Sequence, residues 1–185
     1  MVYRDEVKIL NGKHHKMVIG SRDMAYCGLF GAAALLLPPV FHLLKLGHVF
    51  MPMYLPLVTL AFFANGGIAA LTALLVPIIS AAATGMPPFY PPIAPVMSIE
   101  LSLIALIINW MQKKHSSMPV WLILILALLG GRIINAALLY CAALAIKVPA
   151  GFVAGISFFS GWPGIILMII VIPRLIALKK INRAL

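Results

Sequence analysis

Two ionisable residues, Glu100 and Arg132, lie inside long apolar stretches of this 185-residue sequence. A charged side chain is costly inside a membrane, so such residues usually pair with one another, line a cavity or serve function. Asn135 follows Arg132 by three residues, which places both side chains on one face of a helix. Two interpretations stay open. Glu100 and Arg132 form an ion pair that joins two helices, or Arg132 and Asn135 donate hydrogen bonds to an anionic or amide-bearing ligand.

Three irregular segments, 46–58, 85–95 and 148–162, combine proline or glycine with aromatic residues. Irregular backbone at membrane depth is tolerated only where it is buried in protein or lines a cavity. Because small-molecule pockets have apolar and aromatic walls with a few polar groups, these segments predict a pocket with a lid. The alternative is that the tyrosines and tryptophans anchor the protein at the membrane surface. The candidate wall residues are Phe50, Met53, Tyr54, Met86, Phe89, Tyr90, Phe158, Phe159 and Trp162.

The composition is that of an integral membrane protein. Hydrophobic residues make up 63% of the chain and charged residues only 10%, whereas about 25% is usual for soluble domains. The hydropathy pattern predicts an all-α protein with six transmembrane helices at about 24–41, 55–64, 68–84, 96–111, 120–146 and 163–178, the first ended by Pro38 and Pro39. Residues 1–20 form a basic cytoplasmic arm, 21–178 the membrane domain and 179–185 a cytoplasmic tail.

The charges set the orientation of these six predicted spans. Lysines and arginines gather on the side that holds both termini, and only Lys45 and Lys147 fall on the other side. By the positive-inside rule both termini are cytoplasmic and the three irregular loops are extracellular. The same rule accounts for the net charge of +10, so the basic character does not predict binding to nucleic acid.

Catalysis has little support in the sequence. It contains no HExxH, GxSxG or GxxxxGK[ST] motif, which predicts no metal site, no cofactor and no ATPase activity of its own. Only one acidic residue lies within the predicted spans, and no inverted repeat is visible. Carriers that are driven by an ion gradient usually have such features. If the protein transports a solute, another subunit is expected to supply the energy.

Small residues crowd the start of the first predicted span, where Cys27, Gly28, Gly31 and Ala32 follow Ala25. Gly28 and Ala32 form a small-xxx-small pair, which lets another helix approach closely. This face either packs within the bundle or docks a partner membrane protein.

Several short motifs, taken in order, resemble the substrate-binding S components of energy-coupling factor (ECF) vitamin transporters. They cover about residues 24–178 and consist of Leu46-Gly47, Pro52-Met53-x-Leu55-Pro56, Gly66-Gly67, Thr84-Gly85-Met86-Pro87, Glu100 and Gly131-Arg132. Tyr54 departs from the pattern, because many members of the family carry histidine there. The form of the motifs is most similar to the pantothenate group, and S components for cobalamin, folate or pyrimidines share much of the scaffold.

The resemblance implies a protein of the bacterial cell membrane that captures a vitamin at its outer face and topples to carry it inward. It implies as partners a transmembrane coupling subunit (the T component) and two cytoplasmic ATPases. In that family small residues of the first helix contact the coupling subunit, which here favours partner docking by Cys27, Gly28, Gly31 and Ala32. Arg132 would receive the carboxylate of pantothenate. A self-sufficient carrier and a structural protein with an empty pocket are the competing hypotheses.

Overall fold

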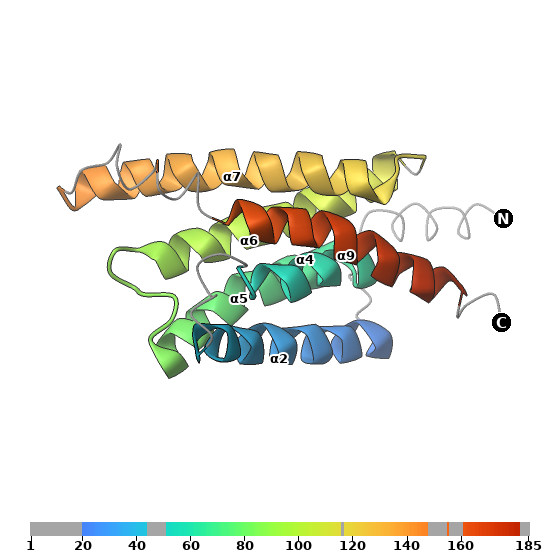
Figure 1. Ribbon diagram of the computed structural model, residues 1–185, viewed down its shortest axis with the longest axis horizontal. Coiled ribbons are helices and arrows are strands. Elements are labelled where there is room, and N and C mark those ends of the chain that lie inside the picture. Colours follow the sequence, from blue (N-terminus) through green and yellow to red (C-terminus); the bar gives the residue numbers. More distant parts are fainter. Residues whose placement is uncertain (1–19, 44–50, 116, 148–154, 156–160, 182–185) are drawn as a thin grey trace, which may run out of the picture.

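The computed structural model describes residues 20–43, 51–115, 117–147, 155 and 161–181. These residues form no strand but six helices, shown in Figure 1: α2 (Ser21–Leu43), α4 (Tyr54–Phe63), α5 (Gly66–Thr84), α6 (Ile93–Lys114), α7 (Val120–Ala145) and α9 (Trp162–Ile181). The all-helical prediction is therefore confirmed for the described part of the chain.

Four of the described helices, α2, α5, α6 and α7, are long and apolar enough to cross a membrane. The chain thus has the helices of a multi-pass membrane protein. The other two apolar helices are shorter, α4 and the Trp162–Leu178 part of α9. With 10 residues, α4 extends about 15 Å, roughly half the hydrocarbon thickness of a bilayer.

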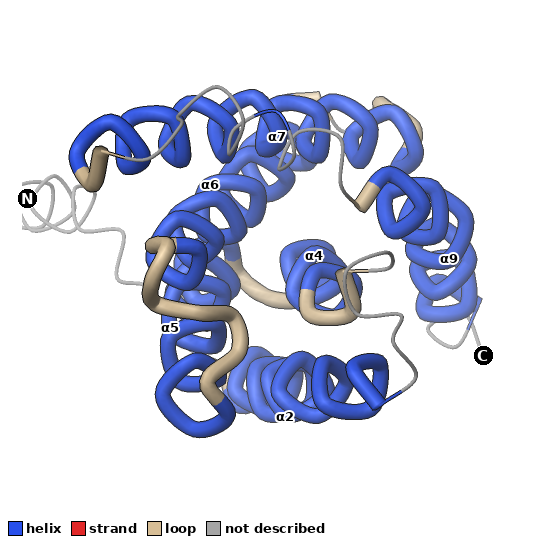
Figure 2. Tube along the Cα trace, turned by 60° about the vertical axis from the view of Figure 1, so that its left-hand side comes forward, coloured by secondary structure: helices blue, strands red, loops and turns tan. Residues whose placement is uncertain are grey.

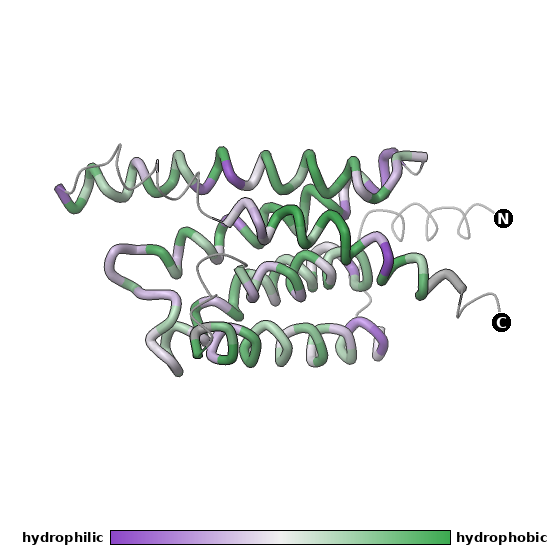
Figure 3. Tube along the Cα trace, viewed as in Figure 1, coloured by the Kyte–Doolittle hydropathy of each residue, from purple (hydrophilic) through white to green (hydrophobic). Residues whose placement is uncertain are grey.

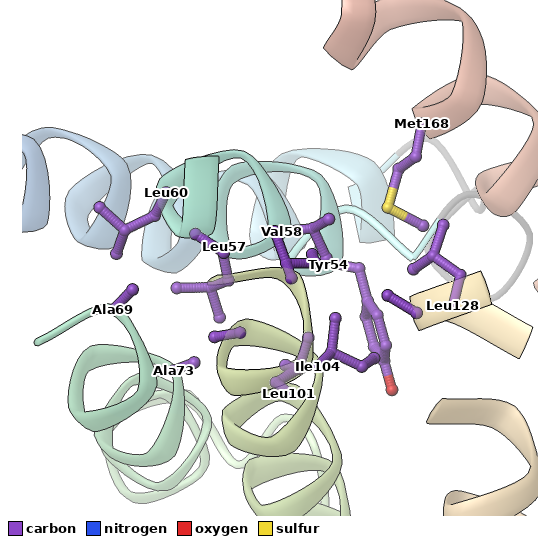
Figure 4. Packing of buried hydrophobic residues seen from close by; sticks show 14 of the residues in the cluster. Tyr54, Leu57, Val58, Leu60, Ala69, Ala73, Leu101, Ile104, Leu128 and Met168 are labelled. Carbon is purple, nitrogen blue, oxygen red and sulfur yellow. The ribbon is translucent and has the colours of Figure 1, made fainter. Parts of the chain in front are cut away.

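The short helix α4 lies at the centre of the bundle. In Figure 2 it is ringed by α2, α5, α6, α7 and α9, and it makes direct contacts with α2, α5, α6 and α9. Its Leu57, Val58 and Leu60 are almost completely buried, and Figure 4 shows them among apolar side chains of α5 and α6. A helix that is apolar all round belongs in a core, so the neighbouring helices rather than lipid surround α4.

Pro38 and Pro39 lie inside α2, which continues to Leu43. The prediction that they end the first helix is wrong. Within a membrane bundle, neighbouring helices and small local adjustments can satisfy the carbonyl groups that a proline leaves without a donor. Pro77 in α5 and Pro173 in α9 also lie inside their helices.

The connection between α4 and α5 is short and capped. The side chain of Asn65 accepts a hydrogen bond from the backbone N–H of Gly67 at 3.2 Å, which caps the first turn of α5. The backbone N–H of Asn65 donates to Asp23 Oδ1 at 3.3 Å. This bond fastens the turn to the first turn of α2.

Basic residues at the helix ends gather at one end of the bundle, whereas Arg132 lies in the middle of α7. Figure 1 shows that α2 begins, and α6 and α9 end, on the same side, and Figure 3 shows hydrophilic residues at these ends. Arg22 lies in the first turn of α2, and Lys113 and Lys114 in the last turn of α6. The connection from α5 to α6 lies at the opposite end.

Candidate functional site

A polar cluster lies in the interior of the bundle, where α4, α6 and α7 meet. Its centre is Glu100, in the second turn of α6 and only 1% exposed. The hydroxyl of Tyr54, the first residue of α4, donates a hydrogen bond to Glu100 Oε2. Asn135 Nδ2, from α7, donates to the same oxygen at 2.6 Å. Three helices are therefore joined at one carboxylate oxygen.

The packing of α4 explains how Tyr54 reaches Glu100. Figure 4 shows its ring between Ile104 of α6 and Leu128 of α7, with the hydroxyl oxygen beyond these apolar side chains. The ring is part of the hydrophobic core, while the hydroxyl meets the polar cluster. A buried tyrosine hydroxyl usually needs such a partner.

Arg132 approaches the cluster from α7, one turn before Asn135, and is 3% exposed. It lies in the middle of α7, where Figure 3 shows a hydrophilic stretch between hydrophobic ones. Its guanidinium carbon lies 5.5 Å from the centroid of the Tyr54 ring, in cation–π geometry. Its Nη2 donates to Met51 Sδ, the one hydrogen-bond acceptor that the described residues give it.

Glu100 and Arg132 do not form the direct ion pair that the sequence left open. In the described part of the chain the partners of Glu100 are Tyr54 and Asn135, and those of Arg132 are Met51 and the Tyr54 ring. Tyr54 therefore lies between the two charges.

The second carboxylate oxygen, Glu100 Oε1, is buried and has no hydrogen-bond partner among the described residues. It lies beside Gly131, where a Cβ would be 3.5 Å away and would overlap the side chain of Ile104. A side chain at position 131 would therefore not fit beside Glu100. Glu100 contacts Tyr54 and Asn135, while Arg132 has donors that no acceptor among the described residues uses.

The structure places the other predicted pocket residues away from this cluster or outside its described part. Met53 is buried in the core, next to Tyr54. Met86 and Tyr90 lie on the exposed connection between α5 and α6, with 43% and 71% of their surfaces accessible. Trp162 is partly exposed at the start of α9. Phe50 and Phe159 lie outside the described residues, as do residues 46–50 of the first segment and most of segment 148–162.

The sequence suggested that the small residues of α2 line one face that meets a single partner. In the structure they differ in burial. Gly28 and Ala32 are exposed and Cys27 is half-buried. Gly31 is buried against α5, where a Cβ would lie 3.8 Å from both Thr72 and Val76. Within this set, Gly28 and Ala32 are the residues that a partner helix can reach.

Sequence reasoning missed Met51 as part of the cluster. It lies just before Pro52, and nothing in its type or spacing indicates a contact with Arg132, which follows 81 residues later. Comparison with known proteins adds no further assignment: no protein-family model, curated protein or solved structure matches the chain.

Proposed function

We propose that this chain is the substrate-capture subunit of an ECF-type vitamin importer, with pantothenate as the substrate. The observation that carries the proposal is the state of Arg132. A guanidinium group has five donors and cannot lose its charge in a protein. Here it is buried within a membrane-length helix, and its acceptor among the described residues is a thioether. Glu100 interacts with this cation electrostatically, but no carboxylate among the described residues accepts a hydrogen bond from it. Charge-assisted hydrogen bonds are the strong ones, so a ligand with an anionic group is the natural complement.

Pantothenate fits this chemistry. Its carboxylate can accept two parallel hydrogen bonds from a guanidinium group, which are among the strongest that side chains make. The resemblance of Pro52-Met53-x-Leu55-Pro56 and Thr84-Gly85-Met86-Pro87 to the pantothenate group points to the same vitamin. Vitamins of the cobalamin, folate or pyrimidine type are the alternatives within the same family.

We also propose that the chain crosses the bacterial cell membrane six times, with both termini in the cytoplasm. The basic ends of α2 and α6, which share one end of the bundle, support this orientation. The exposed pair Gly28 and Ala32 suits close contact with a helix of the coupling subunit. The two ATPases of that complex would drive the toppling of the loaded subunit.

One observation favours a second candidate, a carrier that needs no partner. Glu100 is a buried ionisable group, one of whose carboxylate oxygens has no donor among the described residues. Such groups form proton relays in some membrane transporters. A carrier of this kind would take up its substrate without ATP.

Uptake into proteoliposomes separates the two functions. The purified chain is reconstituted alone, and in parallel with an ECF coupling subunit and its ATPases, and the entry of radiolabelled pantothenate is measured with and without internal ATP. The proposal predicts ATP-dependent uptake by the full complex and none by the chain alone. Equal uptake by the chain alone would establish the carrier instead.

A further inference from the structure

Met51 lies on the guanidinium group of Arg132, at the point where α4, α7 and α9 approach one another. Arg132 Nη2 donates to Met51 Sδ. On its other side Met51 packs against Gly161, just before α9, so closely that a Cβ at position 161 would overlap the Met51 side chain. Gly161 has φ of +79°, a conformation that glycine adopts without strain. The absence of a side chain at position 161 gives Met51 its place over Arg132.

The contact between Met51 and Arg132 is chemically weak for a buried cation. A thioether sulfur is a weak hydrogen-bond acceptor. A carboxylate offers a guanidinium group two charge-assisted hydrogen bonds instead of one weak one. An anion that reached Arg132 would therefore replace the sulfur with a net gain in interaction energy.

The backbone at Met51 is tied to α4, while its side chain is unbranched. Its carbonyl oxygen accepts a hydrogen bond from the N–H of Tyr54 at 2.9 Å, so the residue is tied to the first turn of α4. Its φ of +46° is unusual for a residue other than glycine, and such backbone outliers often occur at functional sites. The side chain is half-buried and has three rotatable bonds. Moving this side chain would break no backbone hydrogen bond of α4.

We propose that Met51 is a displaceable cap, whose thioether occupies the anion-binding position on Arg132 until the carboxylate of the ligand replaces it. This inference rests on the proposed function, because it takes Arg132 as the residue that receives the anionic group. It adds a residue that sets specificity: a ligand without an anionic group has little to gain from displacing the sulfur. Binding then requires the Met51 side chain to move while Tyr54, Glu100 and Asn135 stay joined.

The proposed cap is tested by giving position 51 a carboxylate that competes with the ligand for Arg132. Met51→Glu places a carboxylate on a side chain of similar length beside Arg132, where it acts as a tethered competitor at high effective concentration. Pantothenate binding, measured by titration calorimetry on the full-length protein in detergent, should weaken by at least about tenfold, the usual effect of losing a charge-assisted hydrogen bond. Met51→Leu keeps the volume without the competing charge and should bind pantothenate at least as tightly as the wild type. Met97→Leu, on the partly buried face of α6, is the matched control and should have no effect.

A spectroscopic measurement follows the Met51 side chain directly. It does not require that a substituted protein bind pantothenate. The protein is labelled at its methionine methyl groups, and the Met51 resonance is assigned by its loss in Met51→Leu. The resonance should move in Arg132→Gln without ligand, and in the wild type when pantothenate is added. It should stay in place with pantothenol, in which a hydroxymethyl group replaces the carboxylate.

The outcomes separate the two claims. Wild-type protein that binds pantothenate while the Met51 resonance does not move, or Met51→Glu that binds it as tightly as the wild type, overturns the cap and leaves the proposed function standing. Wild-type protein that binds no vitamin overturns the proposed function, and the cap with it. A Met51 resonance that is the same in Arg132→Gln and in the ligand-free wild type overturns the contact itself, whatever the ligand.

Discussion

The hydroxyl of Tyr54 donates a hydrogen bond to Oε2 of Glu100, while the ring of the same tyrosine faces the guanidinium group of Arg132. One side chain of the short central helix thus contacts both ionisable residues that the membrane-length helices α6 and α7 bury. Its removal should affect the stability of the bundle and the geometry of the proposed site.

Tyr54→Phe removes one of the two donors to a buried carboxylate oxygen. We expect a loss of about 1–3 kcal/mol in the free energy of unfolding, the cost of leaving a buried polar group without its partner. The measurement is the midpoint of thermal unfolding in detergent. Tyr140→Phe is the matched control, because Tyr140 is exposed on α7 and surface substitutions usually change stability by less than about 0.5 kcal/mol. Equal midpoints for the two variants would show that the Tyr54 hydroxyl does not stabilise the fold.

Asn135→Asp places a second carboxylate where an amide now donates to Glu100 Oε2 at 2.6 Å. Two close carboxylates repel each other and cannot both remain charged, so this variant should be less stable than Asn135→Ala. When Glu100→Gln is added, an amide again faces a carboxylate, but the amide is now on α6 and the carboxylate on α7. The double variant should recover part of the loss, seen as a coupling energy of about 0.5–3 kcal/mol in a double-mutant cycle. Additive effects would mean that the two side chains do not interact.

Gly66→Ala tests the close approach of α5 to α6. A Cβ at Gly66 would lie 2.6 Å from the Cβ of Asn109, which is too close to the helix backbone to be relieved by a rotamer change. Overpacking of this kind costs about 1–3 kcal/mol, and the thermal midpoint should fall. Gly130→Ala is the control, because a Cβ at that position meets nothing within 4 Å. Alanine also has the better helix propensity, so Gly130→Ala should be neutral or stabilising.

Gly28→Leu and Ala32→Leu should prevent assembly with the coupling subunit and leave pantothenate binding unchanged. Both residues are exposed on α2, and a large side chain there would keep a partner helix at a distance. Gly31→Leu should behave differently, since its side chain would press on Thr72 and Val76 of α5 and destabilise the chain itself. Co-purification with the coupling subunit measures assembly. Normal assembly of both exposed-site variants would remove this face from the proposed interface.

The helices follow from features that the sequence displays locally. Long apolar segments separated by prolines, glycines and charges predict their number and approximate bounds, because the bilayer fixes how long an apolar helix must be. The ends proved less predictable: Pro38 and Pro39 lie within α2, since tertiary neighbours decide whether a proline breaks a helix. The sequence also did not predict how α2 is rotated about its own axis. Packing on α5 decides this, because it buries Gly31 and leaves Gly28 exposed.

The polar cluster was predictable in part. Glu100, Arg132 and Asn135 are polar residues in apolar helices, and the cost of burying them indicates that they must find partners. That Tyr54 joins Glu100 to Arg132 depends on how deeply α4 lies in the bundle, which no local pattern encodes. The contact of Met51 with Arg132 likewise arises only when α4 and α7 meet.

The most direct test of the central claim is thermal stabilisation of the purified protein by a panel of water-soluble vitamins, with Arg132→Ala in parallel. A ligand at about 1,000 times its Kd stabilises the folded state by about 4 kcal/mol. Pantothenate should raise the thermal midpoint of the wild type. Arg132→Ala should fold but bind pantothenate more than about tenfold more weakly, because the charge-assisted hydrogen bonds are lost. A folded wild-type protein that no vitamin stabilises would rule out the proposed vitamin-capture function, and equal stabilisation of Arg132→Ala would rule out the role given to Arg132.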